Sequence, residues 1–396
     1  MTDQVLAKKS GNCQGSRKMS QVKEKIEVED MLKPNITDFL ILMVAENASD
    51  LHLRVPSPPV LRIDGMLIPQ NQYPDLTPED IEDIFSQITT EEQRGLFLKD
   101  SELDFALSIP RLARFRVSVM KQRDTLSIAF RQVPFEIPTI DDLGLPQILK
   151  RLILKPRGLV LITGPTGSGK STTLASMVNF LNETDAKNIL TIEDPIEYLY
   201  GNKNCLIAQR ELRQDTKSFD IALKHALRHD PDVIIVGEMR DLDTISTAIS
   251  AAETGHLVLG TLHTTDAVQT VDRVLDLFPP TQQQQIRLQL SQVLEAVCSQ
   301  TLLRRLSGKG RIAAMEIMLS NTAIRHLIRE RKTFEIPSTM QLNAVEGMQT
   351  LEQSLAYLVK KELVSEEEVL LKTSHPDKLK KLIHATYNTN QSKLNY

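Results

Sequence analysis

The chain has 396 residues, of which 41% are hydrophobic, and its formal net charge is −4. This length predicts two or three domains of about 100–200 residues each, with enough apolar residues to fill ordinary cores. The balanced charge argues against a nucleic-acid motor, because proteins that bind DNA or RNA carry a clearly basic domain or stripe. Aromatic residues make up only 4% of the chain and tryptophan is absent, so stacking on bases is also disfavoured.

Three cysteines, Cys13, Cys205 and Cys298, lie far apart in the sequence. Their spacing fits neither a disulfide framework nor a C-x-x-C metal or redox site, which favours a reducing, cytoplasmic compartment. No stretch approaches the roughly 20 apolar residues of a membrane span, and the start lacks the apolar core of a signal peptide. We therefore expect no direct membrane insertion, and any membrane connection to run through a partner.

Residues 1–30 are polar and charged, without apolar periodicity, which predicts a disordered tail. Its basic residues could contact phosphate or membrane, but a solvated tail is the simpler interpretation. Residues 386–396 form a second tail without a pattern that can be assigned.

Residues 31–138 have the pattern of a small α+β domain. Helical spacing begins at Ile36, a helix start lies at Thr77-Pro78, and Asp64-Gly65 is a hairpin turn signal. Strands are predicted near Leu51–Val55, at Phe115–Met120 and at Leu126–Arg131.

Residues 139–280 alternate short apolar runs with helical patterns, which predicts a mostly parallel sheet covered on both faces. The predicted strands are Leu159–Thr163, Ile189–Ile192, Val233–Val236 and Leu257–Leu262. Residues 281–385 are predicted to be almost entirely helical.

The sequence GPTGSGKS at residues 164–171 fits the phosphate-binding loop G-x-x-x-x-G-K-[ST] and lies between a predicted strand and an amphipathic helix. Glycines let backbone N–H groups converge on an anion at a helix N-terminus, where Lys170 neutralises phosphate oxygens and the Ser171 hydroxyl reaches Mg²⁺. We expect ATP and Mg²⁺ as ligands. The predicted nucleotide-binding residues are Gly164, Pro165, Thr166, Gly167, Ser168, Gly169, Lys170, Ser171 and Thr172.

Acidic residues follow two of the predicted strands: Glu193, Asp194 and Glu197 after one, Glu238 after the other. Such residues alone would more often be helix caps and surface charge. After a phosphate-binding loop, the carboxyl ends of parallel strands are where ligand groups gather, which favours a role in hydrolysis. His256 and His263 flank another strand, and each is either a structural histidine or a sensor of the γ-phosphate.

These four segments, in this order, resemble the Walker A motif, Asp box, Walker B motif and His box of the type II and type IV secretion ATPase superfamily. The resemblance runs from about Asp38 to Ile383. It implies an α/β fold with a RecA-like P-loop NTPase core, a small N-terminal PAS-like α+β domain and a helical C-terminal region.

The resemblance also implies roles for the candidate residues. Glu197 would activate the attacking water, and Glu238 would support catalysis and, with Ser171, hold Mg²⁺. His263 and His256 would sense the nucleotide state. Arg116 and Arg131 of the small domain would close on the phosphates as arginine fingers, the alternative being surface or strand salt bridges.

Two features resemble the type IV pilus retraction ATPases within this superfamily. The segment AIRHLIRE at residues 323–330 is similar to their A-I-R-N-L-I-R-E helix, and GMQT at 347–350 to their C-terminal segment. Three scattered cysteines cannot build the tetracysteine zinc module of extension and type II secretion ATPases. The resemblance implies a homo-hexameric motor that docks on an inner-membrane pilus platform protein at the inner face of the cytoplasmic membrane and drives twitching motility. An assembly or secretion ATPase and an accessory nucleotide-binding ring remain alternatives.

Overall fold

The computed structural model describes residues 35–63, 65–110, 112–133 and 136–385, so both predicted tails, 1–30 and 386–396, lie outside the described residues. The chain divides into two compact units, Met1–Val133 and Pro134–Tyr396. This boundary lies slightly before the predicted one at residue 138.

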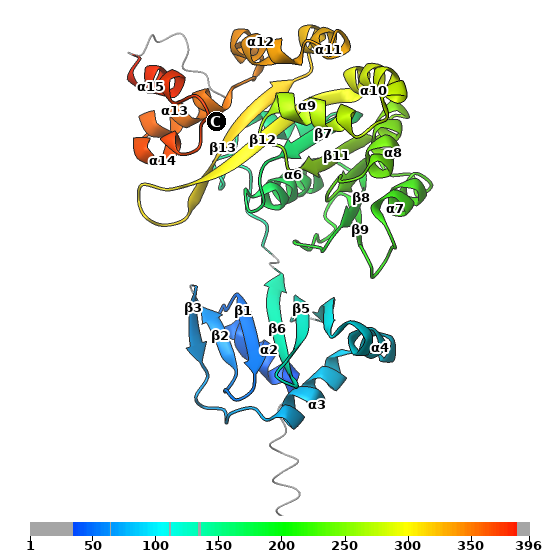
Figure 1. The fold of residues 1–396 in the computed structure, drawn as a ribbon, viewed down its shortest axis with the longest axis vertical. Helices are drawn as coiled ribbons and strands as arrows, with labels where there is room; N and C mark the ends of the chain where they lie inside the picture. Colours follow the sequence, from blue (N-terminus) through cyan, green and yellow to red (C-terminus); the bar gives the residue numbers. More distant parts are fainter. Residues whose placement is uncertain (1–34, 64, 111, 134–135, 386–396) are drawn as a thin grey trace, which may run out of the picture. The chain divides into compact units, whose positions relative to one another are not determined.

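The first unit is an α+β domain, as predicted (Figure 1). Its described sheet has six antiparallel-paired strands in the order β3-β2-β1-β6-β5-β4. Ile63 lies opposite Met66, which confirms the hairpin, and Thr77 forms a capping box with Asp80 at the predicted helix start. The elements are α2 (Ile36–Ala45), β1 (Asp50–Arg54), β2 (Val60–Ile63), β3 (Met66–Pro69), α3 (Pro78–Ile88), α4 (Glu91–Asp100), β4 (Glu102–Ile109), β5 (Ala113–Gln122) and β6 (Thr125–Val133).

The second unit is built on a described sheet of seven strands in the order β13-β12-β7-β11-β10-β8-β9. All pairs are parallel except β12 with β13. The strands are β7 (Gly158–Thr163), β8 (Asn188–Glu193), β9 (Leu206–Glu211), β10 (Val233–Val236), β11 (Leu257–Leu262), β12 (Leu294–Arg304) and β13 (Arg311–Leu319). The four predicted core strands are confirmed as β7, β8, β10 and β11.

Helices cover both faces of this sheet, so its central strands are apolar on both sides. α5 and α6 pack on one face, and α7 to α12 pack on the other. These helices are α5 (Ile148–Ile153), α6 (Lys170–Thr184), α7 (Phe219–Ala226), α8 (Leu242–Glu253), α9 (Ala267–Asp276), α10 (Pro280–Val293), α11 (Thr322–Arg329) and α12 (Ile336–Leu342). The mixed α/β fold class is confirmed.

The prediction of an almost entirely helical region after residue 281 is wrong for β12 and β13. β12 pairs in parallel with β7 and therefore belongs to the core sheet, and β13 completes a long hairpin. Most of the run from Leu294 to Leu303 is buried on both faces of the sheet, and such a run lacks the alternation of apolar and polar residues that distinguishes a strand from a buried helix.

The region begins with α10, and the chain after the hairpin is again mainly helical. Short 3₁₀ turns lie at η1 (Thr333–Glu335) and η2 (Ala344–Glu346), followed by α13 (Leu351–Lys360), α14 (Glu366–Leu370) and α15 (Pro376–His384). α13 to α15 pack with the end of the hairpin in a separate apolar cluster.

Candidate functional site

The phosphate-binding loop joins the buried strand β7 to α6. Gly164 has φ +143° and Gly169 has φ +88°, values that L side chains rarely adopt. A Cβ atom on Gly164 would lie 2.3 Å from the backbone oxygen of Gln300, so the loop also needs glycine there for space. The helix that follows is held in place by the burial of Leu174, Met177 and Leu181, each contributing about 1.5–3 kcal/mol.

Lys170 begins α6 and folds back over this loop. Its Nζ donates hydrogen bonds to the backbone oxygens of Gly164, at 2.8 Å, and Pro165, at 3.1 Å. Burial lowers the pKa of Lys170, and the negative charge of Glu238 opposes that change. The Lys170 ammonium group therefore lies against the phosphate-binding loop, and it is influenced by the negative charge of Glu238, the acid predicted to act with it.

Glu238 follows β10 at the same edge of the sheet as the loop, because β10 and β7 both run parallel to β11. His263 Nε2 lies 3.0 Å from Glu238 Oε1, and Arg240 binds the same carboxylate with two nitrogen atoms. Burial raises the pKa of Glu238, but the Arg240 hydrogen bond and the charges of Arg240 and His263 outweigh it, so the pKa is lowered. Glu238 is thus an ionised acid with a histidine partner.

The loop that carries Glu238 is fixed to the strand that precedes His263. The Met239 N–H donates to the Thr261 oxygen at 3.0 Å, and the Thr261 hydroxyl donates to the Gly237 oxygen. The Met239 side chain also packs on Gly260, where a Cβ atom would lie 2.6 Å from its terminal methyl carbon. Glu238 and His263 are therefore positioned as one structural unit.

The segment after β8 approaches the phosphate loop through Tyr198. Its hydroxyl lies 3.0 Å from the hydroxyl oxygen of Thr172 in the first turn of α6. The neighbouring Glu197 is exposed, as an acid that must reach bound water would be. This places the second acidic segment beside the loop.

Glu193, which ends β8, was grouped with Glu197 in the sequence without a separate role of its own. Its Oε1 accepts hydrogen bonds from Thr191 Oγ1 at 2.6 Å and Gln209 Nε2 at 3.1 Å. Burial raises the pKa of Glu193, and these hydrogen bonds oppose only part of that rise. The buried carboxyl anchors the segment that carries Glu197, a role that its position in an acidic run did not distinguish from surface charge.

Ser171 and Glu238 supply a hydroxyl and a carboxylate at this edge, and hard oxygen donors of this kind suit Mg²⁺ beside phosphate oxygens. The donor set therefore fits the predicted metal.

Comparison with known proteins identifies the family. Residues 27–311 match the family described as "Type II/IV secretion system protein". The chain belongs to this family. It is similar to the type IV pilus retraction ATPase PilT of Pseudomonas aeruginosa, with 47% identity over 87% of this chain and 99% of the relative. It is also similar to the type IV pilus ATPase PilU of the same organism, with 38% identity over 87% of this chain and 90% of the relative.

A solved structure gives the same result for the fold. The crystal structure of the pilus retraction motor PilT with bound ADP matches with a TM-score of 0.82 and 44% identity, covering 88% of this chain and 99% of that one. The nucleotide in that structure supports nucleotide binding as a property of this secretion-system family.

His256 is not brought to the phosphate loop. It precedes β11, and its backbone oxygen accepts a hydrogen bond from the N–H of Gly158, the first residue of β7. The loop follows the last residue of β7, so a strand of six residues, about 20 Å, separates them. Within this subunit the Nδ1 of His256 lies 3.0 Å from the Ala251 oxygen, and a role of His256 in sensing the nucleotide state stays a prediction.

Arg116 and Arg131 lie in the first unit, directly opposite each other on β5 and β6, and both are exposed. Arg131 Nε donates to Asp50 Oδ1 at 2.8 Å, whereas Asp50 itself is buried. Burial raises the pKa of Asp50, but hydrogen bonds from Ser49 and Arg131 outweigh it and lower the pKa. The structure brings the arginines together on one face, and their contact with phosphate stays a prediction.

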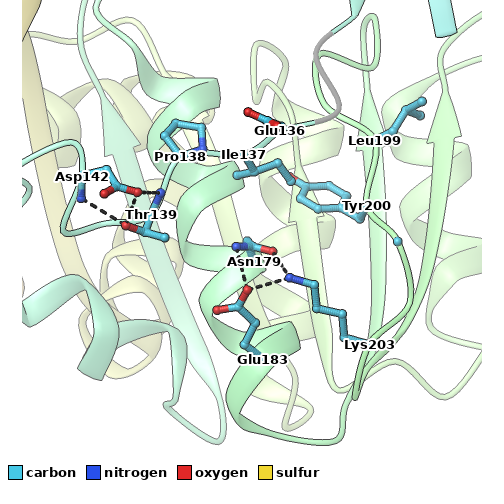
Figure 2. Close-up of a pocket in the computed structure, with 11 residues that line it drawn as sticks. Glu136, Ile137, Pro138, Thr139, Asp142, Asn179, Glu183, Leu199, Tyr200 and Lys203 are labelled. Carbon is cyan, nitrogen blue, oxygen red and sulfur yellow. Dashed lines mark hydrogen bonds and ion pairs between the residues drawn. The ribbon is translucent and has the colours of Figure 1, made fainter. Parts of the chain in front are cut away.

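A separate pocket of about 610 Å³ lies beside α6, away from its first turn. Figure 2 shows it between the segment Glu136–Thr139, Asn179 and Glu183 of α6, and the loop Leu199–Lys203. Lys203 Nζ pairs with Glu183 Oε1 at 2.6 Å in its wall. Its lining includes no residue of the phosphate loop, so it is distinct from the nucleotide cradle.

Across the described residues of this family member, the helices are all too short or too polar to cross a membrane.

Proposed function

We propose that this chain is an ATP-hydrolysing motor that forms a homo-hexamer and powers type IV pilus retraction. Supporting this is the cluster at one edge of the core sheet, where Lys170, Glu238 and His263 meet the phosphate loop. The 47% identity to a protein named as a pilus retraction ATPase supports the direction of force.

In the proposed reaction, ATP binds with its phosphates on the loop 164–172 and Lys170 against the β- and γ-oxygens. Glu197 takes a proton from water as the water oxygen attacks the γ-phosphorus, and the bond to the β,γ-bridging oxygen breaks. Ser171 and Glu238 would hold Mg²⁺, which would supply positive charge beside the phosphates. His263 orients Glu238.

Arg116 and Arg131 would complete the site in the assembled ring. They lie opposite each other and exposed on neighbouring strands, so in the ring two guanidinium groups would reach one anion together once Arg131 leaves Asp50. We propose that they close on the phosphates and thereby couple hydrolysis to movement of the first unit. His256, at the opposite edge of the core sheet, would contribute only indirectly.

The helix α11 is the proposed determinant of retraction. Ile324, Leu327 and Ile328 are buried in the core, so one face of α11 is fixed to the fold. Arg325 is bound to the fold, since it donates to the Ser320 oxygen at 2.9 Å and to Glu295 at 2.8 Å.

His326, which is exposed on α11, and Glu330, which is exposed at its C-terminal cap, would face the pilus platform protein. The motor would then act at the inner face of the cytoplasmic membrane through that partner.

The test is ATP turnover of the purified chain and of Glu197→Gln, with particle mass measured in the same samples. We expect turnover by a six-subunit particle and a loss of about 100-fold or more in kcat, with ATP still bound, because removal of a general base leaves the binding groups in place. Glu367→Gln, which changes an exposed acid of α14, is the matched control. Normal turnover by Glu197→Gln would remove this residue from the mechanism.

Binding without turnover in the unaltered chain would instead support an accessory nucleotide-binding ring. Deletion of the gene in cells then distinguishes a retraction motor from an assembly motor. Loss of a retraction motor leaves cells with surface pili that do not retract, whereas loss of an assembly motor leaves cells without pili.

A further inference from the structure

Gln300 lies under the phosphate loop, although nothing in its local sequence marks it. β12 pairs with β7 as far as Ser299 opposite Thr163, where β7 ends and the chain turns into the loop. β12 continues for five more residues, and Gln300 is the first of them. The side chain is 4% exposed.

Both polar atoms of the Gln300 side-chain amide form hydrogen bonds at the phosphate-binding loop. Nε2 donates to the backbone oxygen of Ser168 at 2.7 Å, and Oε1 accepts from the Thr173 hydroxyl at 2.7 Å. One buried side chain thus joins the loop to the first turn of α6. Loss of either hydrogen bond would leave a buried polar group without a partner, which is unfavourable. The two hydrogen bonds therefore hold the amide in one orientation.

The contact with Ser168 sets the direction of a peptide group that faces the ligand. The peptide bond between Ser168 and Gly169 is trans, since the cis bonds of the described chain are at Val55-Pro56 and Asp194-Pro195. A trans peptide directs its C=O and its N–H to opposite sides. With the Ser168 oxygen held toward Gln300, the Gly169 N–H points to the other side, where an anion on the loop would lie.

The glycines of the loop fit the same arrangement. A Cβ atom on Gly164 would lie 2.3 Å from the Gln300 backbone oxygen, and one on Gly169 would lie 2.9 Å from Gln300 Nε2. The requirement for glycine at these two positions therefore comes from close packing against Gln300 as well as from the backbone angles.

We infer that Gln300 is a positioning residue for the nucleotide: its amide fixes the orientation of the Ser168–Gly169 peptide and so preorganises the phosphate cradle. The inference rests on the proposed nucleotide binding at this loop. It predicts that Gln300 governs nucleotide affinity and not only the stability of the fold.

The experiment measures ADP binding by calorimetry and thermal unfolding on the full chain, for the wild type and for Gln300→Leu. The matched control is Gln349→Leu, because Gln349 is also a buried amide, 3% exposed, whose Nε2 donates to a backbone oxygen, that of Met315 at 2.8 Å. We expect both variants to lose stability. Only Gln300→Leu should weaken ADP binding, by about 10-fold or more, since a lost buried hydrogen bond reorients the loop.

Thr173→Val provides a milder second variant, because it removes only the hydrogen bond to Gln300 Oε1 and nearly keeps the side-chain shape. We expect an intermediate weakening of ADP binding. The inference is overturned if folded Gln300→Leu binds ADP within twofold of the wild type. If Gln300→Leu does not fold, unchanged affinity in Thr173→Val overturns it. Absence of ADP binding in the wild type would contradict the proposed function instead.

Discussion

His256 and His263 lie at opposite ends of the same strand, β11, and their surroundings differ. His263, after β11, lies 3.0 Å from Glu238 beside the phosphate loop. His256, before β11, contacts the oxygen of Ala251 at the end of α8. Both lie next to the same strand in the sequence, so the direction of the strand separates a candidate catalytic group from a structural one.

The largest expected effect at the catalytic edge is that of Lys170→Ala. This change removes the one cation that folds over the loop in the described core, and we expect turnover to fall by about 100-fold or more. Direct binding of a fluorescent ATP analogue would show whether affinity falls too. Near-normal turnover would place the reaction elsewhere in the molecule.

A pair of alanine variants tests the contrast between the two histidines. We expect His263→Ala to lower kcat by about 10-fold or more, because it removes the partner that orients Glu238. His256→Ala should change kcat by less than about threefold and act mainly on the unfolding midpoint. Steady-state ATPase assays on both proteins measure this, and equal losses of kcat would contradict the difference between the two histidines.

A smaller, pH-dependent effect is expected from Glu316 of β13, a carboxyl beside the segment that follows His263. Its Oε1 accepts from the Ala267 N–H, which starts α9, at 2.8 Å. Burial raises its pKa from 4.5 to about 7. Asp266 and Glu352 face the same carboxyl, and their negative charges also raise the pKa.

The pKa of Glu316 is higher in the folded state than in the unfolded state. The folded state therefore keeps this proton up to a higher pH. The free energy of unfolding should therefore fall between about pH 4.5 and pH 7, by about 3 kcal/mol from this group, and stay level above. In Glu316→Gln that fall should be absent. Urea unfolding at pH 5 and pH 7.5 measures it, and an equal fall in both proteins would contradict the assignment.

Much of the fold was predictable because local patterns and tertiary structure agree. β10 and β11 match the predicted runs to the residue, and the helix at Thr77 begins where its capping box predicts. The sequence pattern did not predict β12, because a strand buried on both faces has no regular alternation of apolar and polar residues.

The sequence by itself determined the phosphate loop, the acids that follow β8 and β10, and the family, since these depend on residue types at fixed spacing next to a strand. Only the tertiary structure decided that His263 and not His256 joins Glu238, and that Gln300 supports the loop. Both depend on strand order and direction, which bring together residues as far apart as Ser168 and Gln300. Periodicity along one segment carries no information about such neighbours, because parallel pairing is fixed by long-range packing.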